Sequence, residues 1–493
     1  MSWAHDKARV GYQTGRLESA EQGEHAYQKF IEDVAFTHEG ITIRADAVNY
    51  YDQKGILEAH GHIKIINEDG SVLLVADRLS YDVNKKLVQL RSRVVYQPGT
   101  IVCYTDQLDY EVDTQRAYFS QGGKLVSGDH ILHSESGHYD HLDKTATFHQ
   151  QTELVSPDQT LQCDSLQYNI ASQTAQFTGP TKVMTQNGAI LTTEEGGTYN
   201  TSSRSSTFKH GKVETADYIL MSDLLKADQT ADRYTTEGQV QLIVKNHKTT
   251  ITGDSGQYWK AKRKVQVSGN PLMQHVTNKD TLYLAADTFL VQEEQLADGS
   301  IDTVVQAYNN VKIYQSGLQG KADSMAYHSL ASTMYFYNKP ILWSYDSQIT
   351  AETISIVLHG QELRKMYMDQ GAFIATEDAL GNFNQLKGSN MVAHFKDQQI
   401  TCIATENDSE SLYFIIDDHS QLVGMNYLKC SHIRLDLDQQ KPTKISFFAQ
   451  PTGVFYPPNK IVADQKKLVG FSWHIAERPT LPEILARGCS KYA

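Results

Sequence analysis

The chain has 493 residues, of which 40% are hydrophobic and only 11 are proline, so its composition is that of a folded protein rather than a disordered one. Its 58 acidic and 45 basic residues give a formal net charge of −13 without a long basic run. This balance argues against a nucleic-acid groove, which requires a positive stripe, and against a polybasic membrane patch. No window of about eighteen apolar residues occurs, so no membrane-spanning helix is expected.

Residues 1–40 are predicted to form a degenerate first repeat and an N-terminal cap. The opening MSWAHDKARVGYQTGRLESAEQ has no apolar stretch of signal-peptide length, so either the protein is cytosolic or the leader needed for export is not part of this sequence. The segment ESAEQGEHAYQKFIEDV contains helix-forming residues, but its FIEDVAF part resembles the strands of the units that follow. We therefore expect the segment to be a repeat unit rather than a helix.

Residues 41–345 carry a regular tandem repeat that is seen by aligning tyrosines. Between Tyr50 and Tyr199 these tyrosines recur every 29 to 31 residues, and an acidic residue stands four positions before each one. The residue before the acid is nearly always small, as at Ala45 and Ala76. The acid–tyrosine signature comprises Asp46, Tyr50, Asp77, Tyr81, Asp106, Tyr110, Asp164, Tyr168, Asp254, Tyr258, Asp323 and Tyr327.

Each repeat unit is predicted as two strands separated by turns. VLLVADRLSYD is followed by the polar turn VNKK, and the second strand ends at a Gly, Asn or Asp turn such as QPG. Alternating apolar residues between turn formers are the signature of strands, and glycines inside the second strands, such as Gly61, suggest a bend. One unit cannot bury a face alone, so about a dozen stacked units are expected to form an elongated all-β solenoid with a continuous two-sheet core.

The repeated acids and tyrosines each allow two interpretations. The acids could form a metal ladder, but the glycine-rich nonapeptides of calcium-binding β-rolls are absent, so we favour carboxylates that accept hydrogen bonds from local backbone at a bend. The tyrosines are interpreted as a stacked structural ladder rather than as a sugar-binding platform. The small residue before each acid is expected because close contact between neighbouring rungs or between the two sheets leaves no room for a large side chain.

The end of the chain is less regular. Residues 346–460 are predicted as divergent β repeats, and residues 461–493 as a C-terminal tail or cap in which RPTLPEILARG forms one short helix. The five cysteines are far apart and lack a Cys-x-x-Cys spacing, so they are interpreted as free thiols.

Alternating apolar residues follow the bends and are candidates for the walls of an open groove between two sheets, with ordinary core as the alternative. A bend can reverse the parity of a strand, so the inward face is not fixed by the pattern alone. The groove candidates are Ile63, Ile65, Leu79, Leu108, Leu125, Leu166, Val183, Val240, Leu242, Val311 and Ile313.

No catalytic fingerprint accompanies this pattern. A Gly-x-Ser-x-Gly elbow, a His-Glu-x-x-His motif, a P-loop and a dinucleotide fingerprint are all missing from the sequence. His60 and His62 would share one face of a strand, but no third ligand stands nearby. We therefore expect no enzyme activity, no cofactor and no metal, and keep a polysaccharide-active β-helix only as a third candidate.

The phrases ADAVNYYDQKGILEAHGHIKI, VADRLSYDVNKKLVQL and CDSLQYNIASQTAQFTG resemble the repeat of the OstA/LptA-type proteins of lipopolysaccharide transport. The resemblance extends from about residue 40 to residue 345. It implies a β-jellyroll folded like a taco, with an apolar interior that shields acyl chains in the periplasm between the inner and outer membranes. It also implies partners: lipopolysaccharide or a related lipid, and related jellyrolls that stack edge to edge.

The physical argument agrees with this resemblance. Each acyl CH₂ exposed to water costs about 0.8 kcal/mol, so ten of them cost roughly 8 kcal/mol. The leading hypothesis is therefore a periplasmic, non-enzymatic bridge or scaffold for lipopolysaccharide transport, possessing an apolar groove and possible contact with the outer membrane. The alternative is a closed β-solenoid that serves as a structural or adhesion scaffold and polymerises through its sheet edges.

Overall fold

The computed structural model describes residues 10–22, 25–68, 70–186, 188–216, 218–245, 248–277, 280–360, 362–397, 399–438 and 441–488. Two compact units are present, one of residues 1–215 with 224–231 and the other of residues 216–223 with 232–493. Their boundary falls inside the stretch of regular repeats. The domain boundaries predicted at residues 40, 345 and 460 are based on how regular the sequence repeat is, whereas the two units are defined by their internal contacts. These boundaries therefore stay a prediction.

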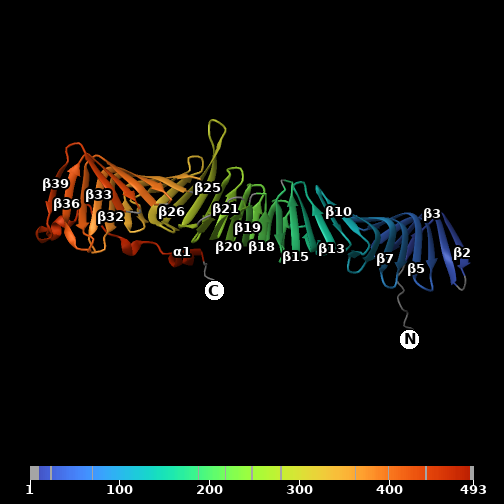
Figure 1. Cartoon of the computed structure of the whole chain (residues 1–493). Coiled ribbons are helices and arrows are strands. Elements are labelled where there is room, and N and C mark those ends of the chain that lie inside the picture. Colours follow the sequence, from blue (N-terminus) through green and yellow to red (C-terminus); the bar gives the residue numbers. More distant parts are fainter. Residues whose placement is uncertain are drawn as a thin grey trace. The chain divides into compact units, whose positions relative to one another are not determined.

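Unit 1 is built from antiparallel strands that follow one another in chain order (Figure 1). Its strands are β1 Gly11–Gln13, β2 Arg16–Gln22, β3 His25–His38, β4 Ile41–Tyr51, β5 Ile56–Asn67, β6 Val72–Asp82, β7 Leu87–Pro98, β8 Val102–Glu111, β9 Arg116–Phe119, β10 Gly123–Ser127, β11 His130–Ser134, β12 Ser136–Asp140, β13 Thr145–Val155, β14 Gln159–Asn169, β15 Thr174–Thr185, β16 Ile190–Thr193, β17 Gly197–Asn200 and β18 Ser205–Glu214. Strand β19, Tyr218–Asp228, contributes residues to both units.

The long strands bend at their middle. The register of β5 with β6 shifts between His60 and Ile63, and the register of β7 with β8 shifts between Arg91 and Val94. Each bend divides a strand into one half in layer A, such as residues 63–67 of β5, and one half in layer B, such as residues 56–60. Short strands such as β9 and β10 are the two halves of one bent strand, because β8 pairs with both of them.

The bend depends on backbone that few residues adopt readily. Gly61 and His62 have φ of 78° and 42°, and Ser92 and Arg93 have φ of 66° and 50°. The signature acid of the preceding strand lies opposite each pair: the Asp46 carboxylate contacts His62 at 2.8 Å, and Asp77 accepts two hydrogen bonds from Arg93 at 2.7 and 2.8 Å. These hydrogen bonds hold the pKa of Asp77 below its usual value.

At these two bends the signature acids Asp46 and Asp77 bind side chains of the next strand rather than local backbone. Asn310 and Asn338 donate in the same way to Asp287 and Asp323, at 2.7 and 2.9 Å. The small residues before the acids, such as Ala76, are buried at the inside of the corner, where the two layers meet. The repeated small residue is thus required because a larger side chain would hold the two halves apart.

Contacts across the interior show that layers A and B face each other. Tyr139 of layer B lies 5.7 Å from Tyr96 of layer A, measured between ring centroids, and His38 Nδ1 of layer A lies 2.5 Å from the Tyr81 hydroxyl of layer B. The signature tyrosines Tyr81 and Tyr199 are 1% and 2% exposed. The contacts of Tyr81 and Tyr139 reach across the interior, whereas Tyr258 stacks on Tyr234 of the neighbouring strand.

The turns that end layer B share a cap that the sequence analysis missed. At several of these turns an Asp or Asn directly after the repeat tyrosine accepts hydrogen bonds from backbone N–H groups two or three positions later. Asp82 accepts from Asn84 and Lys85, and Asp140 accepts from Asp143. Such Asx turns fix the hairpin and hence the register of the strands on either side.

Unit 2 continues the same antiparallel pattern of bent and half strands (Figure 1). Its elements are β20 Arg233–Val244, β21 Thr249–Trp259, β22 Lys264–Ser268, β23 Leu272–Val276, β24 Thr281–Ala285, β25 Thr288–Gln295, β26 Ile301–Gln315, β27 Leu318–His328, β28 Thr333–Tyr337, β29 Ile341–Ser344, β30 Ser347–Thr350, β31 Thr353–His359, β32 Glu362–Glu377, β33 Phe383–Lys396, β34 Gln399–Glu406, β35 Ser409–Ile416, β36 Leu422–Cys430, β37 His432–Asp438, β38 Lys441–Phe448, β39 Thr452–Tyr456, η2 Pro458–Lys460, η3 Ala463–Lys466, η4 Ile475–Glu477 and α1 Leu481–Gly488.

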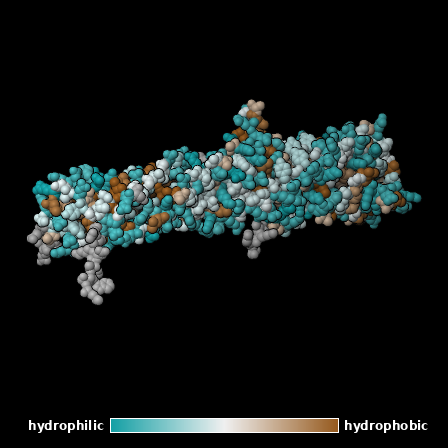
Figure 2. All heavy atoms as spheres, turned by 180° about the vertical axis from the view of Figure 1, so that it is seen from behind, coloured by the Kyte–Doolittle hydropathy of each residue, from teal (hydrophilic) through white to brown (hydrophobic). Residues whose placement is uncertain are grey.

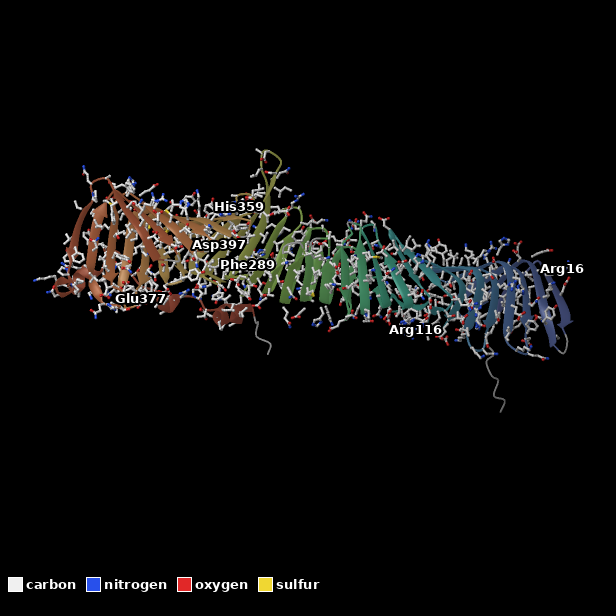
Figure 3. All side chains as sticks on the ribbon, viewed as in Figure 1. Arg16, Arg116, Phe289, His359, Glu377 and Asp397 are labelled. Carbon is white, nitrogen blue, oxygen red and sulfur yellow. The ribbon has the colours of Figure 1, made fainter. Side chains whose placement is uncertain are left out.

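The two rows of turns of unit 2 lie at opposite edges in Figure 3, where Glu377 marks the layer A turns and His359 and Asp397 mark the layer B turns. Phe289, also labelled, belongs to the apolar core between the layers and is 1% exposed. The core of unit 2 is therefore assembled from both layers, as the two-sheet prediction required.

The C-terminal residues 457–488, which we call the strap, pack on the outer face of layer A in unit 2. Leu468 is buried against Phe373, Leu412 and Phe414, and Ile484 of α1 is buried against Leu272. The predicted short helix is thus confirmed as α1, and the strap explains why this outer face is apolar.

Polar contacts fix the strap in place. The Gln385 amide donates to Lys466 O and accepts from Leu468 N, both at 2.8 Å. The Gln348 amide binds the backbone of Ser472 and His474 in the same manner. Since both glutamines are 3% exposed, these amides satisfy backbone groups that water cannot reach.

The described residues also bear on the remaining sequence predictions. Residues 16–22 and 25–38 form strands β2 and β3, as expected for a repeat unit rather than a helix. Among the described residues, α-helix is found at Leu481–Gly488. Within the described ranges, no helix has the length and apolar character needed to cross a bilayer. Cys103, Cys163, Cys402 and Cys430 are free thiols, whereas Cys489 lies outside the described residues.

Replacing a glycine at a bend by alanine should destabilise the protein more than the same replacement in an open turn. Gly196 has φ of 84°, and a Cβ placed there would overlap the backbone carbonyl of Phe177, whereas at Gly99, with φ of 72°, a Cβ meets nothing within 4 Å. We expect Gly196→Ala to lower the free energy of unfolding by more than about 3 kcal/mol and Gly99→Ala by about 1 kcal/mol. Urea denaturation of both variants measures the difference, and equal losses would contradict the packing of this bend.

The Asp140 cap should make stability depend on pH. Hydrogen bonding from the Asp143 N–H and from Arg116 lowers the pKa of Asp140, which is 5% exposed. A lowered pKa in the folded state gives stability that is present above pH about 4 and is lost as the pH falls through the folded value. Asp140→Asn should therefore lower the thermal midpoint at pH 7 and lose most of this effect near pH 3. An effect of equal size at both pH values would mean that charge on Asp140 is irrelevant.

Candidate functional site

The groove candidates all face the interior between layers A and B. They lie on strand halves of both layers and are buried to different extents. Leu242 is partly buried and packs against the core of unit 2. The other ten are 0 to 6% exposed: Ile63, Ile65, Leu79, Leu108, Leu125, Leu166, Val183, Val240, Val311 and Ile313.

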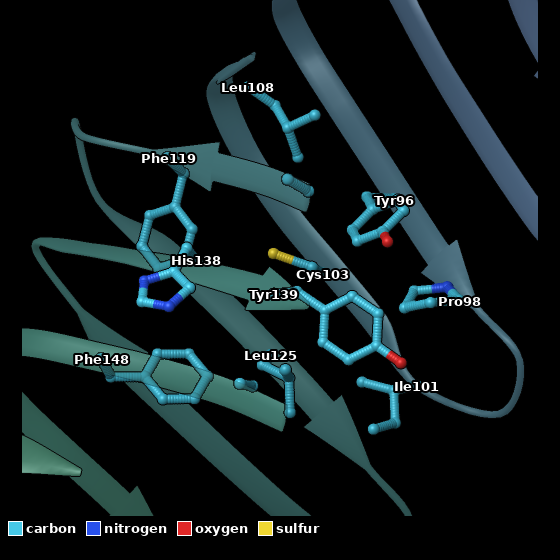
Figure 4. Close-up of a pocket in the computed structure, with 12 residues that line it drawn as sticks. Tyr96, Pro98, Ile101, Cys103, Leu108, Phe119, Leu125, His138, Tyr139 and Phe148 are labelled. Carbon is cyan, nitrogen blue, oxygen red and sulfur yellow. The ribbon is translucent and has the colours of Figure 1, made fainter. Parts of the chain in front are cut away.

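The interior of unit 1 is closely packed with side chains around Tyr96 and Tyr139. Figure 4 shows rings of Tyr96, Phe119, Tyr139 and Phe148 converging from several strands on a cavity of only about 20 Å³. A space of this size holds about one water molecule. Burial raises the pKa of the Cys103 thiol at this cavity to about 12, so the thiol stays protonated and acts as a small apolar group.

Polar pairs close unit 1 on the side opposite the bends. Lys86, in a layer B turn, lies 3.5 Å from Glu39 in a layer A turn, and Arg204 and Asp158 are joined at the same distance. The side-chain amide of Gln229 likewise donates a hydrogen bond across the two layers, to Gln159 at 3.1 Å. We call these cross-layer contacts the latches. Together with the His38–Tyr81 contact, they hold the layers of unit 1 together at the edge where a groove would open.

The interior of unit 2 is roomier at the end of the last strands. A cavity of about 360 Å³ lies between layer A strands β32, β33 and β35 and layer B strands β34, β37 and β38. The side chains of its apolar wall are Ile374, Leu386, Ile400, Ile403, Ile433, Leu435, Leu437 and Ile445. Leu435, Leu437 and Ile445 are only partly buried, in contrast to Ile63 at the same kind of position in unit 1.

One end of this cavity is polar and lies at the layer A turns. The residues there are Ser344, Tyr345, Asp346, Ser347, Thr376, Asn384, Gln385, Ser411 and Tyr413. Burial raises the pKa of the Tyr413 hydroxyl, which is therefore neutral at physiological pH. Among the described residues that line the cavity, none is basic and Asp346 is the acidic one.

The strap lies beside this polar end. Gln385 both lines the cavity and binds the backbone of the strap, and Arg478 of the strap donates to Tyr345 O at 2.9 Å. The strap thereby holds two of the segments that shape the polar end. The cavity is thus formed by both layers, and the strap holds its polar end from outside the lining; no single repeat motif specifies this arrangement.

Other candidate sites gain no support from the geometry. His60 and His62 stand on either side of a bend, so they do not share a strand face as the sequence analysis expected. Among the described residues, no three His, Cys, Asp or Glu side chains gather in a way that could hold a metal ion. A depression of about 590 Å³ at the bends of β13 to β16 is lined by polar residues, including Thr181 and Lys182.

The outer surface contrasts with the interior. On the face seen in Figure 2, hydrophilic residues predominate and hydrophobic residues are scattered. Larger exposed apolar groups occur at the last strands, where Phe448 of β38 and Phe455 of β39 are 50% and 51% exposed. In the described strand pairs, β38 and β39 each have one neighbour, so both present a free edge.

Comparison with known proteins supports the resemblance noted in the sequence. Residues 12–164 and 151–223 match the family described as OstA-like protein. The crystal structure of LptH, described as the LptA homologous periplasmic component of the conserved lipopolysaccharide transport device from Pseudomonas aeruginosa, aligns with 22% of this chain and 74% of its own, at 16% identity and a TM-score of 0.18. No curated protein matches the chain. The chain is therefore similar to the OstA-like family over residues 12–223.

Truncating the same residue type should reveal the difference between the two interiors. Ile63→Ala removes a fully buried side chain from the filled interior and should lower the free energy of unfolding by about 4 kcal/mol. Ile445→Ala enlarges an existing cavity at a partly exposed position and should lower it by about 1 kcal/mol. Chemical denaturation provides the measurement, and a larger loss for Ile445→Ala would mean that the cavity is closed in solution.

Proposed function

From the OstA-like character of residues 12–223 we propose that this protein is a non-enzymatic lipid-binding component of lipopolysaccharide transport. The observation that carries the proposal is an interior lined from two facing layers by aliphatic and aromatic side chains, together with a polar exterior. Such an interior can cover acyl chains, and each buried CH₂ contributes about 0.8 kcal/mol. The chain's charge of −13 repels lipid phosphates on average, so affinity must come from acyl burial.

The proposed setting is the periplasm, with the protein acting as a bridge or scaffold between inner and outer membranes. LptH, to which part of the chain is similar, is described as a periplasmic component of such a device. The free edges of β38 and β39 could add strands of related jellyrolls, because an unpaired edge presents N–H and C=O groups to a partner. Lipid, neighbouring jellyrolls and contact with the outer membrane all belong to the proposal.

A second candidate function is favoured by the interior of unit 1. There the latches join the two layers, and the close packing around Tyr96 leaves no room for an acyl chain at that place. A closed solenoid that acts as a structural scaffold would need only such a closely packed interior and such cross-layer contacts. Under the transport proposal, by contrast, the layers of unit 1 must separate at the latches before lipid enters.

The two functions differ in bound lipid. Protein exported to the periplasm and purified gently should retain lipopolysaccharide or a related lipid, detectable by mass spectrometry of an organic extract. Photoreactive residues at Ile63, Leu125 and Val240 should then crosslink to lipid, because all three face the interior. Protein that carries no lipid and crosslinks only to its own strands would overturn the transport proposal.

The latches provide a matched control for this test. Lys86→Glu places like charges across the layers opposite Glu39, whereas Lys85→Glu changes an exposed neighbour whose side chain pairs with Asp82 in the same turn. Lys86→Glu should increase lipid crosslinking at Ile63 several-fold, and Lys85→Glu should leave it unchanged. If both variants behave like the wild type although lipid is bound, lipid enters without opening this edge.

A further inference from the structure

We propose that the cavity of unit 2 is a binding site for a single acyl chain whose first polar group is neutral, such as an ester, amide or hydroxyl. The inference rests on the proposed function, since it assigns a ligand class to one place in the interior. It differs from the sequence expectation of an unbroken groove, because the candidate groove residues of unit 1 are packed closely whereas this space is open. The cavity lies in residues 344–445, outside the part of the chain that matches the OstA-like family.

The volume of the cavity fits one chain. The cavity has a volume of about 360 Å³. An apolar cavity of about 150 Å³ is sufficient to bind benzene, so a space more than twice as large is well within the range that takes one alkyl chain.

The walls match an acyl chain along its length. Ile374 and Leu386 line the cavity from layer A, and Ile433 and Leu435 line it from layer B. These branched aliphatic side chains offer no hydrogen bonds, so water inside the cavity gains little. Each methylene that enters should improve affinity about fourfold.

The polar end selects the group attached to the chain. Asn384, Tyr413 and Ser411 supply neutral donors and acceptors, while Asp346 is a carboxylate in the same lining. A phosphate at this end would face Asp346 without a basic partner in the lining. An ester, amide or hydroxyl can instead exchange hydrogen bonds with the amide and hydroxyl side chains. Phosphates of a larger lipid would have to lie outside the cavity.

The location is also consistent with access from one side. The partly exposed Leu437 and Ile445 lie on the last strands, where β38 has no further neighbour in the described pairs. The strap secures the opposite layer through Gln385 and Tyr345. Layer A is therefore held firmly around the site, and the edge formed by β37 and β38 is the side at which a chain enters.

The test uses the full chain and two twelve-carbon probes. Monolauroylglycerol, which has a neutral head, should bind with a stoichiometry of one in titration calorimetry, and dodecyl phosphate should bind at least tenfold more weakly. Asp346→Lys should reduce or reverse this preference, whereas Asp417→Lys, at an exposed turn outside the lining, should leave it unchanged. Equal binding of both probes to the wild type would overturn the assignment of the polar end.

A second measurement locates the site without altering it. Monolauroylglycerol with a diazirine in its chain should label peptides that contain Ile403, Leu435 or Ile445, as read by mass spectrometry. Leu435→Phe should reduce labelling at least tenfold, and the surface substitution Leu142→Phe, at a residue that is 66% exposed, should not. Circular dichroism confirms that both variants fold.

The outcomes separate the two proposals. Labelling confined to unit 1 would overturn the assignment of the cavity and leave the transport proposal standing. Labelling of unit 2 alone, with a single chain bound, would support the cavity. If neither this probe nor co-purified lipid binds anywhere, the proposed function and the inference both fail.

Discussion

The structure depends on one constraint: each long strand must fold back on itself so that its two halves bury their apolar faces against each other. The bend requires a pair of residues with positive φ, as at Gly61 and His62, and a small residue at the inner corner, as at Ala76. The signature acid stabilises the same corner from outside through the next strand, as Asp77 does with Arg93. The positive-φ pairs and the signature acids lie on neighbouring strands, as in β5 and β6, so the bends of paired strands align and an interior forms within each unit.

The packing of that interior is not uniform, and this is where function can differ between the units. In unit 1 the latches pull the free edges together, and aromatic residues such as Tyr96 and Phe148 fill the remaining space. In unit 2 the corresponding wall is made of smaller aliphatic residues, and in the described strand pairs β38 and β39 each have a neighbour on one side only. A closely packed interior makes unit 1 rigid. The cavity of about 360 Å³ in unit 2 instead leaves apolar surface available for a ligand.

The strap adds a third layer to unit 2. Its apolar residues Leu468 and Ile484 cover an outer face that would otherwise be exposed, and buried glutamines on layer A satisfy its backbone. Layer A of unit 2 is thereby packed on both faces, so it is the less deformable wall of the cavity. A protein that opens to admit a chain would be expected to move its other wall.

The sequence by itself determined the all-β fold, the period of the repeat and the position of the bends, because these follow from local alternation, turn formers and a signature that recurs in every unit. It also identified the interior candidates, such as Ile63 and Val240, and the short helix α1. Only the tertiary structure decided that the acids bind the next strand, that latches join residues more than forty positions apart, such as Glu39 and Lys86, and that one end of unit 2 is hollow. These features depend on which turns meet across two layers and on how side-chain volumes add up between them, and neither quantity is encoded in the pattern of a single repeat.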